Sequence, residues 1–500
     1  MGRTQARLVW VVAVMTLLAG AAVVPAQADH AEPKTVTTRN FTYEPTPTAI
    51  DIGDHLRLTN ADAVPHDVTA RDTDDSGEPL FSSELVSGGG SAPVNGVEDL
   101  APGSYSFYCT IHAQMAGTLA VGAAGPTVPG PPGLTIASVP TPTSITEFDG
   151  NLYVASYGAS AVFELPILPG GVPGPATAYI TGVSSPLGVT FDEDGTAFVS
   201  DSHPAATPGR TTAGRVWAVP PGGGDVAEVG EVVLDELPNG RHNTNGMTIA
   251  DGRLYVTNGN STDDGIAGGE PEEPLSGTLL SVPVSARGIV IGVNDATADL
   301  VVEARGMRNT YDVVLRPGTS EAWMAMNGPD EQDPWGEDLL LMANVAPPVE
   351  GAIHEPEDFG FPACLYAAGF DPGYRQNENP AVTQVCDGSQ DLPQELMGLH
   401  TSANGLDFGP DTTGWDGDLF VALFGNFFGD EIVGHRIVRV PIDEAGASSP
   451  PEDFLILPAP LDLTFVGDVM YVADFAAGVI VVPAGVGTAP AATSSQLSNF

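Results

Sequence analysis

The sequence predicts an all-β chain whose larger part is a six-bladed β-propeller. Short runs of alternating apolar and polar residues recur along the second part of the chain, and turn residues separate them. One strand–turn–strand unit occurs six times at intervals of tens of residues, which is typical of a propeller. A Pro- and Gly-rich stretch from Gly122 to Gly133 separates these repeats from a first, different part of the chain.

The first 28 residues have the features of a cleaved export signal. Arg3 and Arg7 supply positive charge, residues 8–24 are mostly apolar, and small residues at 26–28 form a cleavage site. No later apolar run is long enough to span a bilayer, so we expect a secreted or extracytoplasmic protein without a membrane span. The predicted organisation is a signal peptide at 1–28, a first domain at 29–122, a linker at 123–133 and a propeller at 134–500.

The chain is strongly acidic, with 64 Asp and Glu against 17 Lys and Arg and a formal net charge of −47. Nucleic acids and anionic membranes bind to cationic surfaces, so this charge argues against both as partners. It is compatible with a cationic ligand such as Ca²⁺. Most of the carboxylates are interpreted as solvated surface, and the charge alone predicts no catalysis.

A cysteine, a histidine and a methionine occur at Cys-x2-His-x2-Met spacing in the segment from Tyr108 to Gly117. They are Cys109, His112 and Met115, and His66 lies upstream. Two His, one Cys and a weak axial Met make a blue-copper electron-transfer site. Taken singly, these residues would be a core Cys, a surface His and a packing Met. Their order along the chain favours a copper site.

Further short motifs frame these residues in a fixed order. They are Phe41-x-Tyr43-x-Pro45, Ile50–Asp54, Asn60, Pro65-His66, Pro102–Tyr105 and the Cys-His-Met run. In this order the segment from about residue 35 to 122 resembles a plastocyanin- or pseudoazurin-type cupredoxin. The resemblance implies a small β-sandwich with one type 1 copper, bound by His66, Cys109, His112 and Met115.

Six hairpin units follow the linker, each built from a strand, a turn rich in Asp and Gly, and a second strand. They occupy residues 144–155, 188–201, 246–257, 311–325, 405–422 and 461–474. The spacing widens after the fourth unit, which predicts an insertion at about 343–402. Long excursions from compact folds are usually functional or disordered.

Two of the three cysteines, Cys364 and Cys386, lie in this insertion. With Cys109 assigned to copper, they form an even pair in an oxidising compartment, and a disulfide is the simplest prediction. A crosslink that closes a loop of this size contributes about 3 kcal/mol if unstrained, which favours an ordered insertion. A second metal site is less favoured, because no His lies between the two cysteines.

Several motifs of the propeller carry a second resemblance. In chain order they are Gly240–Gly246, Gly306–Asn309, Asn327–Asp330, Phe359–Pro362, His400–Leu406 and Gly434–Pro441. Residues 140–485 thereby resemble the soluble quinoprotein glucose and sorbosone dehydrogenases, six-bladed propellers that use pyrroloquinoline quinone (PQQ) and calcium. The repeats also resemble exported propellers encoded with scytonemin pigment genes, a family that implies little chemistry.

The dehydrogenase resemblance implies roles for five residues. His242 would be the general base that takes the proton of a sugar hydroxyl, a task that suits an imidazole near neutral pH. Arg308 and Asn309 would hold oxygens of the quinone, and the backbone carbonyls of Gly328 and Pro329 would bind Ca²⁺. The cofactor would perform the redox chemistry.

The chain departs from the dehydrogenase pattern in the quinone pocket. That family has a Lys late in the fifth blade and Arg residues at the start of the sixth, whereas residues 422–426 and 457–461 here contain no cation. Asn-Gly and Arg-Asn pairs also serve turns well, so a purely structural role for the motifs stays open.

Two functions follow from these patterns. In the first, the propeller oxidises a sugar or another alcohol with PQQ, and the copper domain passes the electrons to a partner protein or a small acceptor. Tethering would raise the effective concentration of the donor at the copper. In the alternative, the propeller is a non-catalytic binding or scaffold module attached to a copper electron carrier.

Overall fold

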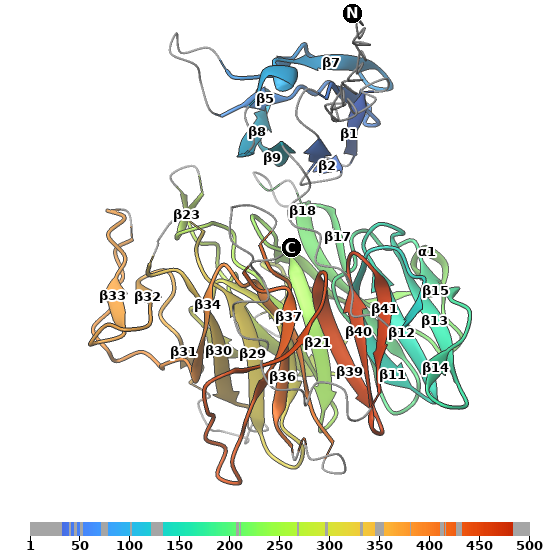
Figure 1. Ribbon diagram of the computed structural model, residues 1–500, viewed down its shortest axis with the longest axis vertical. Coiled ribbons are helices and arrows are strands. Elements are labelled where there is room, and N and C mark those ends of the chain that lie inside the picture. Colours follow the sequence, from blue (N-terminus) through green and yellow to red (C-terminus); the bar gives the residue numbers. More distant parts are fainter. Residues whose placement is uncertain are drawn as a thin grey trace, which may run out of the picture.

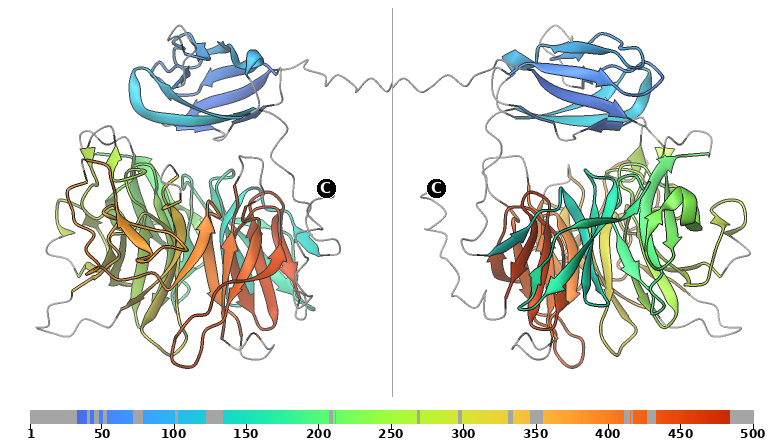
Figure 2. Two further views of the ribbon diagram at one scale, coloured as in Figure 1. Left: turned by 60° about the vertical axis from the view of Figure 1, so that its left-hand side comes forward. Right: turned by 90° about the vertical axis from the view of Figure 1, so that its right-hand side faces the viewer.

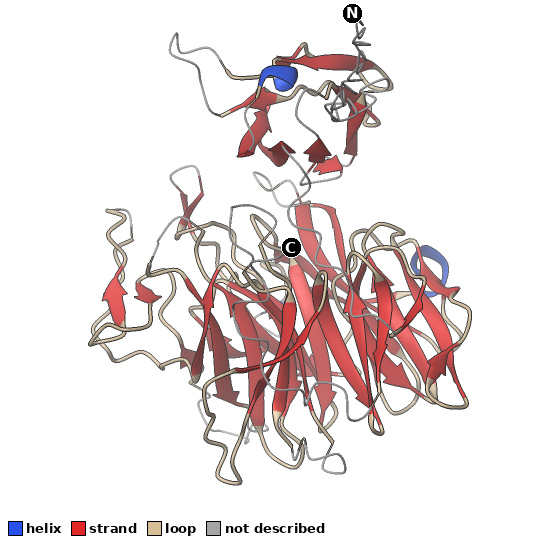
Figure 3. Ribbon diagram, in the orientation of Figure 1, coloured by secondary structure: helices blue, strands red, loops and turns tan. Residues whose placement is uncertain are grey.

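The structure is a computed structural model, and it describes most of the chain between residues 33 and 483. The described ranges are 33–39, 42–44, 48–50, 54–71, 79–100, 103–121, 134–206, 210, 212–267, 270–295, 299–330, 334–345, 355–380, 382–410, 415, 417–426 and 433–483. The predicted signal peptide lies outside these ranges, and so does the predicted linker. Strands dominate, and the short helices η1 (Val97–Asp99) and α1 (Val226–Val229) are small parts of the fold (Figure 3).

The N-terminal domain is built from nine strands in the order β2-β1-β4-β7-β6-β5-β8-β9-β3. Their bounds are β1 (Lys34–Arg39), β2 (Thr42–Glu44), β3 (Thr48–Ile50), β4 (Leu56–Asn60), β5 (Thr69–Ala70), β6 (Ser82–Ser83), β7 (Ser91–Asn95), β8 (Gly103–Cys109) and β9 (His112–Val121). Alternate residues of β4 and β7 are buried, as expected for strands with one face against a core. Val36, Leu58 and Phe107 belong to that core. The fold confirms the β-sandwich that the sequence predicts (Figure 2).

The described part of the propeller contains six blade sheets, one for each predicted unit (Figure 1), and two small two-stranded sheets, of β23 (Ile266–Ala267) with β24 (Glu270–Pro271) and of β32 (Cys364–Tyr366) with β33 (Tyr374–Gln376). Blade 1 contains β11 (Pro142–Phe148), β12 (Asn151–Ser156), β13 (Ala161–Leu168) and β15 (Thr177–Thr181), with β14 (Val172–Pro173) and β19 (Gly224–Asp225) at its edge. Blade 2 contains β16 (Val189–Phe191), β17 (Ala197–Pro204), β18 (Thr212–Val219), β20 (Glu231–Pro238) and β26 (Ile289–Val290). Blade 3 contains β21 (Thr244–Ala250), β22 (Arg253–Asn258), β25 (Thr278–Pro283), β27 (Val301–Arg305) and β31 (Glu357–Asp358).

The remaining three blades have four strands each. Blade 4 contains β28 (Asn309–Leu315), β29 (Glu321–Asn327), β30 (Glu337–Asn344) and β34 (Glu395–Leu399). Blade 5 contains β35 (Ala403–Phe408), β36 (Leu419–Leu423), β37 (Arg436–Val440) and β38 (Glu452–Ile456). Blade 6 contains β39 (Pro460–Val466), β40 (Val469–Asp474), β41 (Gly478–Val482) and β10 (Thr135–Ala137).

The first two strands of every blade form the hairpin that the sequence predicts. In blades 1 and 3 the turn is an Asp-Gly pair with positive φ at both residues, +48° and +79° for Asp149 and Gly150, and +49° and +74° for Asp251 and Gly252. This geometry matches the twist of a two-residue hairpin, and Asp and Gly tolerate it well. The turn chemistry therefore explains why the hairpins could be read from the sequence.

The first strands of the blades line the centre of the ring, where β11, β16, β21, β28, β35 and β39 are neighbours in that order and β39 lies beside β11. The ring is closed by β10, which pairs antiparallel with β41 so that Thr135 lies opposite Val481. The strand that follows the N-terminal domain in the chain thus completes the last blade.

The insertion is a two-part excursion between β30 and β34 of blade 4. It first adds β31 to the edge of blade 3, parallel to β27, and then forms the hairpin of β32 (Cys364–Tyr366) and β33 (Tyr374–Gln376). The excursion is shorter than the predicted range 343–402, because the predicted range includes the end of β30 and all of β34, which pair as regular strands of blade 4.

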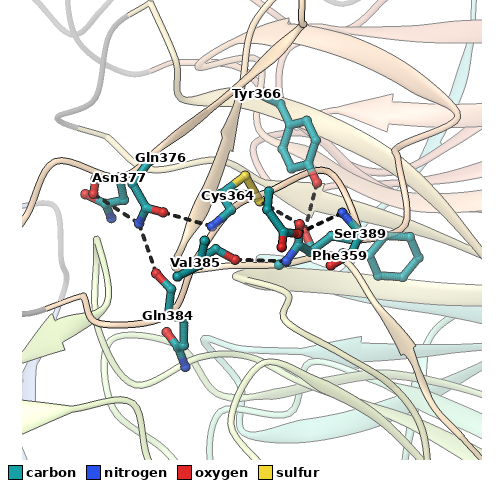
Figure 4. The surroundings of a disulfide bond; sticks show 12 residues. Phe359, Cys364, Tyr366, Gln376, Asn377, Gln384, Val385 and Ser389 are labelled. Atoms are coloured by element: carbon teal, nitrogen blue, oxygen red, sulfur yellow. Dashed lines mark hydrogen bonds between the residues drawn. A yellow bond between two sulfur atoms is a disulfide. The ribbon is translucent and has the colours of Figure 1, made fainter.

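The predicted disulfide between Cys364 and Cys386 is confirmed, with the two Cα atoms 5.1 Å apart. Figure 4 shows hydrogen bonds that hold the same segment. Gln376 accepts one from the backbone N–H of Cys386 (2.8 Å) and donates one to the carbonyl of Gln384 (3.1 Å), while Tyr366 donates to the carbonyl of Phe359 (3.0 Å). The excursion is therefore ordered by a crosslink and by a hydrogen-bond network.

Candidate copper centre and propeller site

Three of the four predicted copper ligands lie in the core of the N-terminal domain. His66 follows β4 and is held by a backbone bridge to Val86, with N–O distances of 3.0 and 2.7 Å. Cys109 is the last residue of β8, and Met115 lies in β9. All three side chains are buried, and His66 and Cys109 have no exposed surface. His112 begins β9 opposite Cys109, but its side chain is outside the described part of the structure.

The geometry of His66 and Cys109 fits a shared metal ion. The Sγ of Cys109 and the Nδ1 of His66 are 3.8 Å apart. Bonds of about 2.3 Å from sulfur and about 2.0 Å from nitrogen, as in zinc sites, would place two ligands at about this separation around one ion. Burial raises the pKa of the Cys109 thiol, so the metal would have to displace its proton on binding.

Asp67 ties together the two segments that carry His66 and Cys109. Its Oδ1 accepts a hydrogen bond from the backbone N–H of Thr110, and its Oδ2 accepts one from the Thr110 hydroxyl, both at 2.7 Å. Its carbonyl accepts a hydrogen bond from the hydroxyl of Tyr43. Because Thr110 directly follows Cys109, these bonds fix the distance between the two ligands.

His242 lies just before β21 and has a defined tautomer. Its Nδ1 is 2.7 Å from Oδ1 of Asn260. The amide nitrogen of Asn260 donates to the carbonyl of Thr262 (2.7 Å) and to Glu272 (2.8 Å), so its oxygen must face the histidine. Nδ1 therefore carries the hydrogen, and Nε2 keeps a lone pair that can accept a proton.

The protonation state of His242 agrees with the role of a base. Burial, and after it the positive charges of Arg308 and Arg241, lower the pKa of His242 well below its usual value. The ring is therefore neutral over the physiological range. His242 can thus accept a proton at Nε2, and its role as the general base stays a prediction.

Arg308 is almost fully buried, and its guanidinium is committed to neighbouring loops. Nε donates to the carbonyl of Asp263 (2.9 Å), Nη1 to the carbonyl of Asn327 (3.3 Å), and Nη2 forms an ion pair with the Asp263 carboxylate. Asp330 lies 3.5 Å from the same Nη2. Burial raises the pKa of Asp263, but Arg308 and Arg241 outweigh it and hold that pKa below its usual value.

Asn309 is engaged in the same way. Its Oδ1 accepts a hydrogen bond from Asn245 (3.0 Å), and its Nδ2 donates to Oδ1 of Asn327 (2.8 Å). The amide thereby connects the inner strands of blades 3 and 4. Arg308 and Asn309, the residues predicted to hold the quinone, therefore direct most of their hydrogen-bonding groups at other parts of the protein.

Gly328 and Pro329, the predicted calcium ligands, follow β29. The N–H of Gly328 donates to Asp338 (2.8 Å), and Thr401 donates to the other oxygen of that carboxylate (2.8 Å). Burial raises the pKa of Asp338 to about 6. These contacts hold the segment in place, and calcium binding by the two carbonyls stays a prediction.

These residues do not fit an anionic quinone in the described conformation. Arg241 pairs with Asp263 and Asp330, as Arg308 does, so the two positive and two negative charges of this group cancel. A tricarboxylate cofactor needs uncompensated cations or a pocket that supplies hydrogen bonds. No step of a mechanism is therefore assigned to PQQ at this position.

The structure also brings together a group that the sequence did not predict. Ligand atoms of His203, Asp235 and Glu236 lie within 4.8 Å of one another. However, Arg215 binds both oxygens of Asp235, at 3.0 and 2.8 Å, and His203 lies 2.8 Å from the same carboxylate. The group is an ion-pair network at the edge of blade 2, which disfavours a bound cation.

A cavity of about 430 Å³ lies between blade 3 and the excursion. Its lining includes Glu272, Arg305, Met307, Phe361 and Gln384. It does not contain His242 or Arg308, although Glu272 connects it to the histidine through Asn260.

Comparisons with known proteins bear on both the N-terminal domain and the propeller. Residues 32–122 match the model of copper binding proteins of the plastocyanin/azurin family. A search of curated protein sequences found no match.

Solved structures share the fold of the larger part of the chain. A carbohydrate-active enzyme of family AA12 from Trichoderma reesei is 17% identical, with a TM-score of 0.56 over 71% of this chain and 97% of that chain. The holo form of the pyranose dehydrogenase PQQ domain from Coprinopsis cinerea is 16% identical, with a TM-score of 0.53 over 72% and 99%. The apo form of the soluble aldose sugar dehydrogenase from Escherichia coli is 13% identical, with a TM-score of 0.50 over 70% and 99%.

At such low identity these likenesses show a common fold alone. They agree with the six blades, and the family match agrees with the buried Cys109 and His66. Residues 32–122 are therefore a copper-binding domain of the plastocyanin/azurin type, and the rest of the chain has a propeller fold similar to that of PQQ-dependent soluble sugar dehydrogenases.

Proposed function

We propose that this protein is an exported one-electron carrier that binds a type 1 copper at His66, Cys109, His112 and Met115. The observation that carries the proposal is the buried pair of Cys109 Sγ and His66 Nδ1 at 3.8 Å. Bound copper would supply the one-electron redox change. The protein's own residues hold the ligands in place through Asn60 and Asp67 and exclude water from them, which keeps reorganisation small.

The Cys109→Ser variant tests this function. Copper-loaded wild-type protein should have an intense blue absorption that is bleached by one electron equivalent, and the variant should lack the colour. A Cys364→Ser/Cys386→Ser double variant is the matched control, because it removes the other two cysteines and should remain blue. Colour that survives in Cys109→Ser would show that the copper ligands are misassigned.

A second candidate function concerns the propeller, which would oxidise a sugar or alcohol hydroxyl with PQQ as the two-electron acceptor, and the electrons would then reach the copper one at a time. The neutral His242 with a free lone pair on Nε2 favours it. The internal pairing of Arg308 with Asp263 favours instead the alternative of a non-catalytic scaffold or binding module. In either case the reduced copper would pass its electron to a partner protein or a small molecule.

Calorimetric titration of the calcium- and copper-loaded protein with PQQ distinguishes the dehydrogenase from the non-catalytic module. Stoichiometric binding, followed by sugar-dependent bleaching of the blue band, would establish the dehydrogenase, and His242→Ala should then abolish bleaching and leave the copper spectrum unchanged. If the paired Arg308 blocks the site, the wild type should not bind PQQ. An Asp263→Asn variant, which releases the guanidinium, should then bind more tightly than a Glu84→Gln control.

A further inference from the structure

Asp62 lies beside the nitrogen of His66 that is not directed at Cys109. Its Oδ2 is 2.9 Å from Nε2 of His66, a close electrostatic contact without the angles of a hydrogen bond, whereas Nδ1 of the same ring faces Sγ of Cys109. An ionised carboxylate accepts hydrogen bonds and cannot donate them. A carboxylate this close to Nε2 stabilises the tautomer with the ring hydrogen on Nε2, which leaves the lone pair of Nδ1 directed towards Cys109.

The loop that carries Asp62 is itself fixed. Oδ1 of Asn60 accepts a hydrogen bond from the backbone N–H of Asp62 (2.9 Å), and Nδ2 of Asn60 donates to the carbonyls of Val64 (2.7 Å) and Val86 (2.8 Å). The side chain of Asp62 is only 11% exposed. A negative charge in such a position is less screened by water than a surface charge and acts more strongly on its neighbours.

We propose that Asp62 is a positioning residue of the copper site, which selects the ring tautomer of His66 and lowers the reduction potential of the bound copper. The inference rests on the proposed copper function. Reduction of copper(II) to copper(I) by one electron removes one positive charge from the centre. The Asp62 carboxylate therefore stabilises the oxidised state more than the reduced state.

Two substitutions separate the charge from the orienting contact. Asp62→Asn keeps an oxygen that can accept from Nε2 but removes the negative charge, so the potential should shift to a more positive value while the blue spectrum persists. Asp62→Ala removes both, so the potential should also rise and the copper affinity should fall about 10–100-fold, the usual effect of losing such a partner.

Glu98→Gln is the matched control, because it removes one carboxylate from the same domain at a distance from copper. β4 pairs with β7 so that Leu56 faces Val94 and Thr59 faces Ser91. Glu98 follows β7 and therefore lies near the start of β4, whereas His66 follows its end. Potentials of Asp62→Asn and Asp62→Ala no higher than that of Glu98→Gln would overturn the proposal.

A copper-free measurement distinguishes failure of this inference from failure of the copper function. Nitrogen-15 NMR of the metal-free, full-length protein should show the hydrogen of His66 on Nε2 in the wild type and a mixture of tautomers in Asp62→Ala. A hydrogen on Nδ1 in the wild type would overturn the role of Asp62. A wild type that has the Nε2 hydrogen but no blue colour with copper would refute the copper function and the effect on potential, while supporting the orienting contact.

Discussion

Asp67 shows how a residue that is not a ligand can determine a metal site. It directly follows His66, and its carboxylate binds the residue after Cys109 through two hydrogen bonds of 2.7 Å. The two ligand segments come from distant parts of the sequence, so this contact replaces a covalent restraint. The site is therefore arranged before the metal arrives.

Replacement of Asp67 by Ala should destabilise the metal-free N-terminal domain by about 2–3 kcal/mol, the value of hydrogen bonds to a buried charged group. Urea unfolding of the full-length, metal-free protein would measure the loss. Asp67→Asn should have a much smaller effect, because its amide can still accept from the Thr110 N–H and donate to the Thr110 hydroxyl. Equal losses in both variants would contradict this account.

At the scale of single residues, the sequence predicted the copper ligands but not the residues that hold them in place. Cys109, His112 and Met115 are recognisable because a short spacing brings their chemistry together. Asp62 and Asp67 contact groups that only the folded loops bring close, so no local pattern distinguishes them from the other carboxylates of this acidic chain. The pairing of Arg308 with Asp263, 45 residues away, was hidden for the same reason.

The excursion is the element that departs most from a simple propeller. It leaves blade 4, adds β31 to blade 3 and returns as β34. Outside these strands, the disulfide and a small hairpin hold it. Its stability should therefore be partly independent of the blades.

A Cys364→Ala/Cys386→Ala double variant should lose about 3 kcal/mol of local stability, as expected for a loop of this length. Limited digestion with trypsin reports this loss, because Arg375 lies inside the crosslinked loop. Cleavage after Arg375 should become roughly 100-fold faster, if it follows local opening. Cleavage after Arg287, in blade 2's edge region, should not change, and a parallel increase there would mean that the whole propeller is destabilised.

The blades were predictable as elements because each begins with a hairpin of strong local signals. Asp-Gly turns and alternating strands act over a few residues, and all six units form inner hairpins. The outer strands, such as β26 and β31, are only two residues long. Their pairing depends on partners far along the chain, which explains why the insertion was predicted too wide.

On one side of the ring, from blade 4 through blades 5 and 6 to blade 1, buried carboxylates connect the inner strands of neighbouring blades. Asp462 of blade 6 accepts from the N–H of Ile145 in blade 1 (2.8 Å), and Asp407 of blade 5 accepts from the N–H of Phe465 in blade 6 (3.1 Å). Burial raises the pKa of Asp407 to about 6. Burial also raises the pKa of Asp462 and of its neighbour Asp312 above the usual range.

Because these folded-state pKa values exceed the unfolded value of 3.8, the native propeller binds protons that the unfolded chain releases. This contribution to the free energy of unfolding is therefore largest at acidic pH and is lost as the pH rises through the folded pKa values. An Asp462→Asn variant should gain on the order of 2 kcal/mol relative to wild type on going from pH 5 to pH 8. Thermal unfolding at both pH values measures this difference.

Asp468→Asn is the control, because Asp468 lies exposed in the turn of the same hairpin. It should show the wild-type pH dependence. If Asp462→Asn also shows the wild-type dependence, the Asp462 carboxylate is already ionised at pH 5 in the folded protein, which would contradict the raised pKa.

The closure of the ring by β10 and β41 imposes an order on synthesis. Thr135 leaves the ribosome early, but its partner Val481 is made only near the end of the chain. At about 5–20 residues per second, roughly 20–70 seconds separate the two. The copper domain can finish folding within that interval. During the same time β10 lacks its partner β41, and an unpaired strand edge is a surface on which chains aggregate. Any chain that ends before β41 would carry a complete copper-binding domain attached to a ring that cannot close.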